Sequence, residues 1–515
     1  VNLEGDGVTS VITSSWTTSF FPILDLRSAE GTNGNQYIKD LKIDGRSYAS
    51  PRGIEVGGRS NVSIHDCTIS NFKEEGVIFD GRQDFDTLPP TIYATGNTFY
   101  NNTVTDCSMY SGFGRGCLSI GGQTGMLIHD NTISQPARTG GNQIGWPIKY
   151  YSEGYLKGVK IYNNTLYKDP AGATGWNFAV ELFNFQGLEM YNNTSTGSWD
   201  FNFQGDRGIY PWVAHIHHNT ISSPVGTGRI EQGLIWEYNV DGALIDSNRF
   251  DNLAQIMTFY CRPWTITKDI VFKGNLCTNI GYPPSIGDGS CIGGFNAGTN
   301  KYIINNFKVY NNTFVGNSTS KINQGIGFGA PDSGYIKNID IRNNYLSNIV
   351  YPGFSIGATG GATIDSVNIS YNNIIGDDQY GIGTNHVYLS SGTIGHYTNT
   401  NNTNNTPSFL DSTNYTLKVT SALIDAGTNV GDPYTGAAPD KGYKEYVTGG
   451  NASPTSNAGI DQSTTSTSVT LNGTGSYDPD GTISTYAWTK ISGTGGTIVS
   501  AGSATTSVTG LSVGV

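Results

Sequence analysis

The stretch Ile128-His129-Asp130-Asn131-Thr132-Ile133 decides the fold, because close copies of it recur along most of the 515-residue chain. Strong copies with a central Asn occupy residues 161–166, 190–194, 216–221, 245–248, 309–314, 341–344 and 369–374. Weaker copies surround Asn97 and Asn275, and Cys67 takes the Asn position in the copy at 64–69. Successive copies lie about 26 to 37 residues apart, which is a typical spacing for solenoid repeats.

Apolar residues alternate around each Asn, as in Val159, Ile161 and Leu166. This pattern predicts a strand, a one-residue corner and a second strand. Asn tolerates the left-handed backbone that such a corner needs, and its side-chain amide can bond to the corner of the next coil. The Asn-x-Thr triplets could also be glycosylation acceptors, but a periodic Asn should point inward. We therefore predict an all-β chain, built as a parallel β-helix with an asparagine ladder.

The composition supports this fold and excludes several classes of protein. Charged residues make up 14% of the chain, against roughly 25% in ordinary domains, and the 69 Gly argue against a helical enzyme. An aromatic content of 11% argues against disorder. The net charge of -12 argues against nucleic acid as a partner. No stretch approaches the ~20 apolar residues of a membrane span.

Residues 1 to about 445 resemble the right-handed parallel β-helix superfamily of pectate lyases, polysaccharide hydrolases and phage tailspikes. Residues 3–12 resemble an early coil of that fold, and residues 421–427 and 439–443 resemble its last coil. Because the chain begins without Met and its last residues read as a strand, we expect it to continue beyond both ends.

A shift to Ser, Thr and Gly marks residues 446–452 as a linker. Residues 453–515 then resemble the first part of a PKD-type immunoglobulin-like module, a partial β-sandwich. The resemblance is carried by Leu471-Asn472-Gly473-Thr474-Gly475-Ser476-Tyr477-Asp478-Pro479-Asp480-Gly481 and by Tyr486-Ala487-Trp488. Such modules are similar to spacers in secreted enzymes and adhesins of Bacteroidota, so the resemblance implies a secreted or cell-surface protein.

The candidate catalytic residues come from outward positions on one strand of each coil. Aligning these strands by their inward apolar residues places Lys149, Glu181, Asp200 and Glu237 in one column on four neighbouring coils. With strands about 4.8 Å apart, Glu181 and Asp200 would lie roughly 5 Å apart at the backbone, and Glu181 and Glu237 roughly 10 Å apart. These values span the carboxyl separations of retaining and inverting glycosidases. Three adjacent carboxylates repel, so at least one should stay protonated and serve as a general acid.

The same column has other interpretations. Earlier coils place Ser119, Ile78 and Glu55 in it, and stacked acids on a sheet can be ordinary surface. The carboxylates could also bind Ca²⁺, structurally or for a polysaccharide lyase. In a lyase, Lys149, Arg207 or Arg262 would supply the base or neutralise the acidic sugar. Neither a lyase signature nor the paired Asp and Gly-His-Gly motifs of polygalacturonases are present.

Six of the eight Trp lie between residues 146 and 264, in the same coils as the acids. Trp199 and Trp236 are predicted to fill the solenoid core. Aromatic faces stack on sugar rings, so the Trp residues that stand beside Pro in loops are predicted to bind substrate. The predicted substrate-binding set is Trp212 and Trp264, Tyr260 and Arg262 beside Trp264, and the charged pair Asp206 and Arg207 near Asp200.

Two further residue types carry no assignment. His215, His217 and His218 suggest zinc, but no partner cluster accompanies them in the sequence and they lie away from the acidic column, so metal binding is not predicted. The six Cys match no zinc module, and their oxidation state and pairing stay open.

We therefore expect a secreted carbohydrate-active enzyme that cleaves a plant or algal polysaccharide. Glycoside hydrolysis, which needs no cofactor, is preferred over a polysaccharide lyase that uses Ca²⁺ and a Lys or Arg base. The alternative from another class is a non-catalytic adhesin or extracellular filament subunit with a β-helical rod and PKD spacers. The enzyme is favoured because acids and Trp cluster in the same coils, whereas a rod would spread both along its length.

Overall fold

The chain folds into two compact units, which are described separately. One comprises Val1–Thr406 and Ala422–Glu445, and the other comprises Pro407–Ser421 and Tyr446–Val515. The computed structural model describes residues 2–14, 21–82, 88–108, 115–136, 145–151, 154–169, 178–203, 206–223, 232–261, 265–281, 290–296, 303–318, 321–322, 324–330, 334–350, 352–358, 361–376, 386–390, 394–447, 454–459, 462, 464–476, 478 and 483–512. Within these residues, no helix is long and apolar enough to cross a membrane.

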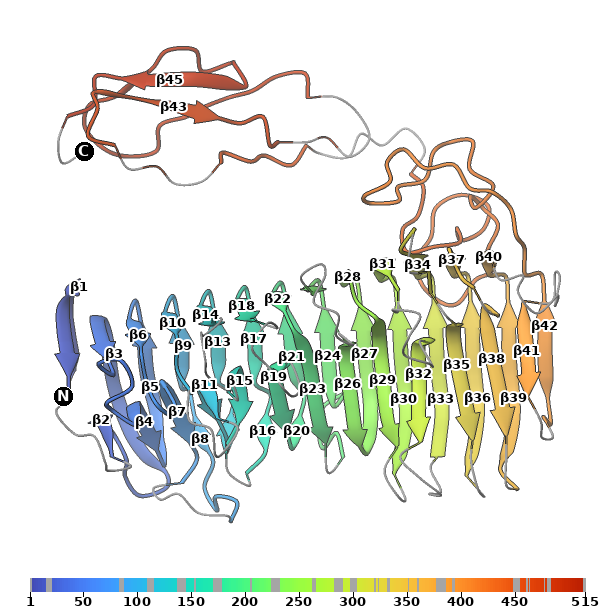
Figure 1. Ribbon diagram of the computed structural model, residues 1–515, viewed down its shortest axis with the longest axis horizontal. Coiled ribbons are helices and arrows are strands. Elements are labelled where there is room, and N and C mark those ends of the chain that lie inside the picture. Colours follow the sequence, from blue (N-terminus) through green and yellow to red (C-terminus); the bar gives the residue numbers. More distant parts are fainter. Residues whose placement is uncertain are drawn as a thin grey trace. The chain divides into compact units, whose positions relative to one another are not determined.

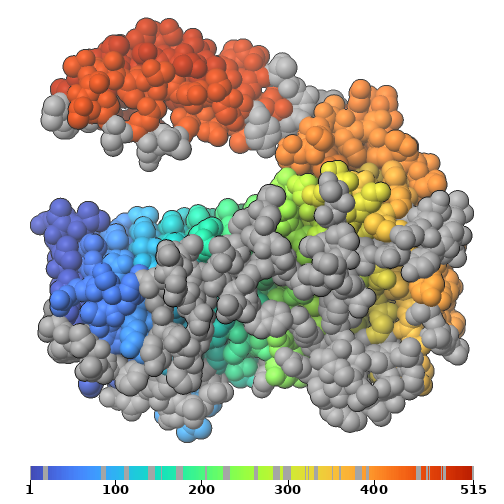
Figure 2. Space-filling model, viewed as in Figure 1, coloured from blue at the N-terminus to red at the C-terminus, as the bar shows by residue number. Residues whose placement is uncertain are grey.

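The larger unit is a parallel β-helix, in which the strands of successive coils lie side by side from β1 to β42 (Figure 1). In space-filling form, its described residues follow one another in sequence order along the unit, from blue to orange (Figure 2). A typical coil contributes one strand to a 13-stranded sheet and two strands, separated by a corner, to a 25-stranded sheet. The predicted all-β architecture is thus confirmed.

The 13-stranded sheet runs in chain order and carries the predicted acidic column. Its strands are β2 (Pro22–Asp25), β4 (Arg52–Gly57), β7 (Val77–Asp80), β11 (Gly116–Ile120), β15 (Trp146–Tyr150), β19 (Phe178–Phe183), β23 (Ser198–Phe203), β26 (Gln232–Tyr238), β29 (Gln255–Cys261), β32 (Ser290–Asn296), β35 (Gln324–Ala330), β38 (Phe354–Ala358) and β41 (Val387–Ser390).

The 25-stranded sheet forms the two sides that meet at the ladder corner. Before the corner lie β1 (Leu3–Thr13), β3 (Thr32–Asp44), β5 (Arg59–His65), β9 (Thr98–Tyr100), β13 (Leu127–His129), β17 (Lys160–Tyr162), β21 (Leu188–Tyr191), β24 (Ala214–His217), β27 (Val240–Asp246), β30 (Ile266–Lys273), β33 (Ile303–Tyr310), β36 (Tyr335–Arg342), β39 (Thr363–Ser370) and β42 (Tyr397–Thr400). After it lie β6 (Thr68–Ser70), β10 (Thr103–Thr105), β14 (Thr132–Gln135), β18 (Thr165–Lys168), β22 (Thr194–Thr196), β25 (Thr220–Ser222), β28 (Arg249–Asp251), β31 (Leu276–Ile280), β34 (Thr313–Gly316), β37 (Tyr345–Ser347) and β40 (Asn373–Ile375). A short third sheet holds β8 (Ala94–Thr95), β12 (Gln123–Thr124), β16 (Leu156–Lys157) and β20 (Phe185–Gln186).

The asparagine ladder is confirmed as a continuous hydrogen-bonded column inside the unit. Asn164 Oδ1 accepts from the backbone N–H of Asn131 at 3.0 Å and from its Nδ2 at 2.9 Å. The Nδ2 of Asn131 also donates to the carbonyl of Phe99, one coil earlier. The same pattern links Asn102, Asn131, Asn164, Asn193, Asn219, Asn248, Asn275, Asn312, Asn344, Asn372 and Asn402.

Two details of the corner differ from the sequence prediction. The left-handed residue is the one before the ladder Asn, as at Asp130 and Asn163, both with φ of 55°. The ladder Asn itself only supplies the amide. In the coil of β9 and β10 the ladder residue is Asn102, whereas Asn97 lies in another corner and donates to Gln123 Oε1 at 2.9 Å. Cys67 does occupy a ladder position, because its backbone N–H donates to Asn102 Oδ1.

The core is a set of apolar columns formed by inward side chains of paired strands. Leu118, Ile148, Val180, Trp199 and Leu234 are Cα partners in successive strands of the 13-stranded sheet, and all are fully buried. Five cysteines are likewise buried as free thiols among the residues whose side chains are described, namely Cys67, Cys107, Cys117, Cys277 and Cys291.

The smaller unit contains a three-stranded antiparallel sheet of β43 (Ser468–Asn472), β44 (Thr497–Ile498) and β45 (Thr505–Thr509). The Trp488 indole donates from Nε1 to the carbonyl of Ser503 at 2.9 Å. Antiparallel pairing of this kind agrees with the predicted immunoglobulin-like module.

The ladder predicts that Asn193→Ala destabilises the β-helix far more than a neighbouring surface change does. Asn193 Oδ1 accepts two bonds from Asn164, and its Nδ2 donates to Asn219 and to the carbonyl of Ile161. Loss of a buried amide with these bonds should cost about 2–4 kcal/mol in the free energy of unfolding, measured by denaturant titration. The exposed Thr194→Ala should change it by less than about 0.5 kcal/mol. Equal effects of the two substitutions would contradict a stabilising ladder.

Candidate functional site

The candidate site lies on the outward face of the 13-stranded sheet. Lys149 on β15 is the Cα partner of Glu181 on β19, and Glu181 is the partner of Asp200 on β23. Three of the four predicted catalytic residues therefore stand in one row across adjacent coils. The row continues upstream through Ser119, Ile78 and Glu55, as the sequence predicted.

Lys149 and Glu181 form an ion pair between Nζ and Oε2, with both side chains largely buried. The Lys149 ammonium also lies 4.2 Å from the centroid of the Trp146 ring and 5.5 Å from that of Phe183. Burial lowers the pKa of Lys149 to about 8, although the charge of Asp200 acts in the opposite direction. The row thus holds a cation that can lose its proton close to neutral pH.

Glu237 does not stand in this row, so its predicted place is wrong. Asp200 pairs with Ile235, and Glu237 pairs with Asn202, two residues further along β23. Leu234 and Trp236 are both inward and buried, so a shift of two residues keeps the inward-outward alternation. The sequence pattern does not distinguish the two registers, because Leu234 and Trp236 are both apolar residues that can pair with Trp199.

The actual register places Glu237 diagonally from Asp200 on the same face. One strand spacing combined with a two-residue rise gives a backbone separation of about 8 Å between them. Asp200 is 2% exposed, and its Oδ2 accepts from Asn202 Nδ2 at 3.1 Å. Glu237 is half-buried. Adjacent Glu181 and diagonal Glu237 thus give Asp200 two carboxylate neighbours at different distances.

A buried charge cluster, which the sequence analysis largely missed, occupies the same face at β4 and just before β7. Arg52 contacts Glu55 Oε2 at 3.2 Å, Glu74 Oε2 at 3.1 Å and Glu75 Oε2 at 3.2 Å. Arg115 contacts the other oxygen of Glu75 at 3.2 Å. Glu75 is fully buried, and Arg52, Glu55 and Glu74 are each at most 5% exposed.

Burial sets the proton affinities in this cluster. It raises the pKa of Glu75, against the opposing effects of Arg52 and Arg115, and it raises the pKa of Glu55 in the same way. Burial alone would lower the pKa of Arg52, but the charge of Glu75 and its neighbours raises it. The hydroxyl of Tyr151 also has a raised pKa, because it is buried next to Glu75. Buried ionisable groups with shifted pKa values are typical of functional sites.

Only part of this cluster had a signal in the sequence. Glu55 falls on the outward position of its strand and was placed in the column. Arg52 and Glu75 lie at or before the start of their strands, where alternation gives no direction for the side chain. Their proximity follows from the stacking of coils, which only the strand register reveals.

Three of the predicted substrate-binding residues, Asp206, Arg207 and Trp212, lie among the residues whose side chains the structure describes. Arg207 is held by Asp241 at 2.6 Å and by Asp269 at 2.5 Å, on two later coils, which is a structural arrangement. Asp206 is exposed and accepts from Gln186 Nε2 at 3.2 Å, so the two do not form the expected pair. Trp212 is half-buried. The backbone of Tyr260 pairs with Glu237, while its side chain, Arg262 and Trp264 lie outside the described residues.

Trp199 and Trp236 are 0% and 1% exposed, as predicted for core residues. Trp146, in contrast, lies beside the row, because its ring contacts the Lys149 ammonium.

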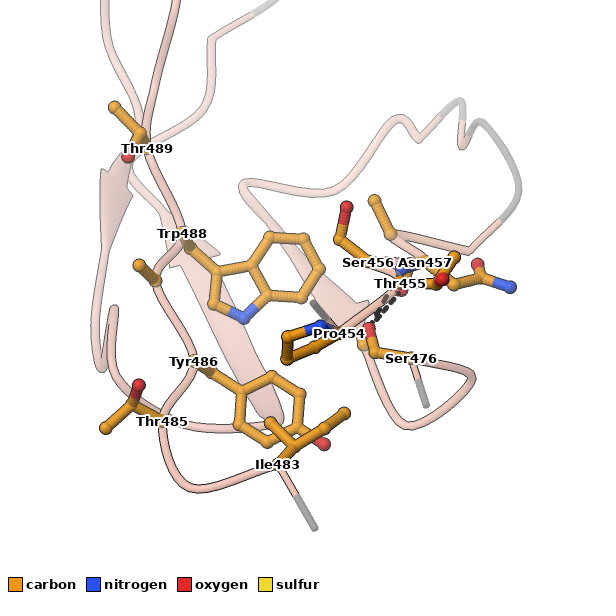
Figure 3. A pocket seen from close by; sticks show the side chains of 13 residues that line it. Pro454, Thr455, Ser456, Asn457, Ser476, Ile483, Thr485, Tyr486, Trp488 and Thr489 are labelled. Atoms are coloured by element: carbon orange, nitrogen blue, oxygen red, sulfur yellow. Dashed lines mark hydrogen bonds between the residues drawn. The ribbon is translucent and has the colours of Figure 1, made fainter. Parts of the chain in front are cut away.

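A pocket in the smaller unit is lined by Tyr486, Trp488, Pro454 and Ile483, with Asn457 and Ser476 at one side (Figure 3). The backbone N–H of Asn457 donates to Ser476 Oγ at 2.9 Å. None of the residues that line this pocket is acidic or basic. It offers an aromatic binding surface without groups for acid or base chemistry.

Comparisons with known proteins give a family match for the C-terminal residues. Residues 458–515 match the family model of a PKD domain. No curated protein matches the chain. Among solved structures, a mutant tailspike protein of E. coli bacteriophage HK620, in complex with a pentasaccharide, is 12% identical with a TM-score of 0.42, covering 77% of this chain and 68% of that chain. The catalytic domain of a GH87 α-1,3-glucanase, in complex with tetrasaccharides, is 14% identical with a TM-score of 0.29, covering 78% of this chain and 60% of that chain.

The buried cluster predicts a pH-dependent effect of Arg52→Met. Without Arg52, the pKa values of Glu55 and Glu75 should rise further above those of the unfolded chain. The folded state then binds protons that the unfolded state releases, so stability falls as pH rises through that window. The variant should lose about 3–5 kcal/mol at pH 7 and less near pH 4.5, as measured by denaturant unfolding.

Lys39→Met is the control for this experiment, because Lys39 contacts no member of the cluster in its ion pairs. Lys39 pairs at 2.8 Å with Glu4, whose side chain is 50% exposed, so its loss should cost far less stability than the loss of Arg52. A deficit of Arg52→Met that does not depend on pH would contradict the electrostatic account of the cluster.

Proposed function

We propose that this protein is a polysaccharide-cleaving glycoside hydrolase, secreted or displayed at the cell surface. The observation that carries the proposal is Asp200, a nearly buried carboxyl with Glu181 beside it and Glu237 diagonal to it on one outward sheet face. Two carboxyl groups facing a sugar chain are the usual requirement for glycoside hydrolysis. The PKD-domain match agrees with an extracellular role, since such modules resemble spacers in secreted proteins.

Asp200 is proposed as the general acid and Glu237 as the general base. Asp200 is 2% exposed and lies beside Glu181, whereas Glu237 is half-buried and keeps access to water. Inverting glycosidases hold their two carboxyl groups about 6.5–9.5 Å apart, which leaves room for a water molecule. A diagonal placement with backbones about 8 Å apart is compatible with that carboxyl spacing. The carboxylate of Glu181 forms an ion pair with Lys149. These two residues are therefore assigned to positioning Asp200 and the substrate.

An extended sheet face suits a polymeric substrate better than a small one. The cationic and aromatic groups upstream of Asp200, Lys149 and Trp146, could bind sugar units on one side of the cleaved bond. We further propose that the polymer is a plant or algal polysaccharide.

A polysaccharide lyase is the second candidate, and the pKa of Lys149 favours it. A lysine with a pKa of about 8 is partly neutral near pH 7.5 and can draw a proton from the carbon beside a uronate carboxylate. Glu181 and Asp200 could then hold Ca²⁺ through their oxygens. In that case activity should rise with pH through about 8, where Lys149 loses its proton, and a chelator should stop it.

The test is an activity screen on neutral and uronate-containing polysaccharides, reading reducing ends and the ultraviolet absorbance of unsaturated products in parallel. We expect reducing ends without unsaturated products, and inversion at the anomeric carbon by NMR. Asp200→Asn and Glu237→Gln should each lower kcat by about 10²–10⁴-fold with little change in Tm, because each removes a proton-transfer group.

Asp130→Asn is the matched control, because Asp130 is an exposed carboxylate on the other sheet and Asn tolerates its left-handed backbone. It should keep full activity. Unsaturated products would favour the lyase, and full activity of both site variants would overturn the assignment of the row. Binding to a polysaccharide without turnover would favour the adhesin.

A further inference from the structure

Two histidines on the 25-stranded sheet stand apart from the site described above. His215 and His217 flank the fully buried Ile216 on β24, so both imidazoles point outward on the same face. Glu189 on the preceding coil is the Cα partner of His215, and Asp246 on the following coil is the partner of His217. Stacking thus brings Glu189, 26 residues before His215, and Asp246, 31 residues after it, to the two imidazoles.

The four side chains contact one another across the strands. His215 Nε2 lies 2.7 Å from Asp246 Oδ1, and His217 Nε2 lies 3.4 Å from Glu189 Oε1. The two imidazole rings lie 4.1 Å apart between centroids. One ligand atom each from Glu189, His215 and His217 falls within 4.8 Å of the other two. Among the described residues, no other group of three His, Cys, Asp or Glu side chains is this compact.

We propose that Glu189, His215 and His217 bind one divalent transition-metal ion of the zinc type. Two imidazole nitrogens and one carboxylate oxygen are the ligand set that zinc uses when a fourth position is left to water or another ligand. Ca²⁺ and Mg²⁺ prefer oxygen donors alone, so the imidazoles select against them. Asp246 Oδ1 lies 2.7 Å from His215 Nε2 and would orient the His215 ring toward the ion. A carboxylate that contacts a metal-binding histidine usually has this role.

The surroundings hold the imidazoles in place. The His217 ring stacks on Tyr191, with centroids 5.0 Å apart and planes 4° from parallel. This stack continues along the coils through Tyr162, His129, Tyr100 and His65, with centroid distances of 4.6–5.0 Å. A ring fixed in this way loses little freedom when it binds an ion.

The neighbouring charges leave one oxygen of Glu189 for the ion. Lys160 Nζ binds Glu189 Oε2 at 2.6 Å, while Oε1 faces His217. His218 Nδ1 lies 2.9 Å from His217 Nδ1, on the side away from Glu189. The side chains of Glu189, His215 and His217 are 28%, 31% and 17% exposed, so an ion can reach them from solvent. The histidines alone suggested zinc in the sequence, and metal binding was not predicted because the carboxylates that complete the group belong to other coils.

The test is isothermal titration of the tag-free full chain with ZnCl₂ and, separately, with CaCl₂. We expect saturable binding of one Zn²⁺ per chain and no comparable binding of Ca²⁺. The double variant His215→Ala/His217→Ala should abolish this binding, and Asp246→Asn should weaken it by about 10–100-fold. X-ray absorption of the zinc complex should show two imidazoles in the coordination shell.

The control is His129→Ala, which removes an imidazole from the same ring stack but should keep one Zn²⁺ per chain. If the double variant fails to fold by circular dichroism, Glu189→Gln replaces it and should weaken binding by at least about tenfold. Absence of saturable Zn²⁺ binding, or binding that survives loss of these ligands, would overturn the proposal. The hydrolase proposal is unaffected by either result, because its residues lie on the 13-stranded sheet.

Discussion

The asparagine ladder is the constraint on which the rest of the structure depends. Each ladder amide bonds to the amide of the next coil and to a carbonyl of the previous one, so every coil is held at the same register. A buried amide without these bonds would be costly, because no water can replace them. Since the corners are fixed, outward residues of successive strands fall into rows. Those rows, and not segments of sequence, form the candidate sites.

The two outward surfaces show that the stacking of coils brings together ionisable side chains that are distant in the chain. On the 13-stranded sheet, Lys149, Glu181 and Asp200 come from three coils. Arg52 and Arg115 meet around Glu75 in the same manner further upstream. Placing so many charges together out of water costs free energy that a purely structural rod could avoid. This concentration on one face is the main physical argument for a functional surface.

The sequence predicted the fold well, because the repeat has a simple physical cause. The copies of Asn, with apolar neighbours in alternation, require corners, strands and inward side chains at known positions. Most of the row was predicted for the same reason. Glu237 was misplaced because a shift of two residues leaves alternation unchanged, and Trp236 matched Trp199 as well as Leu234 did. Arg52, Glu75 and the partners of His215 were missed because their contacts depend on corner geometry and coil stacking, which alternation does not encode.

The most direct test of the central claim is to locate a bound oligosaccharide. The inactive Asp200→Asn variant would be crystallised with a fragment of whichever polysaccharide the protein cleaves or binds. A sugar chain should lie across β15, β19, β23 and β26, with its scissile linkage between residue 200 and Glu237. A chain bound only at the aromatic pocket of the smaller unit, or on the 25-stranded sheet, would contradict the assignment of this face.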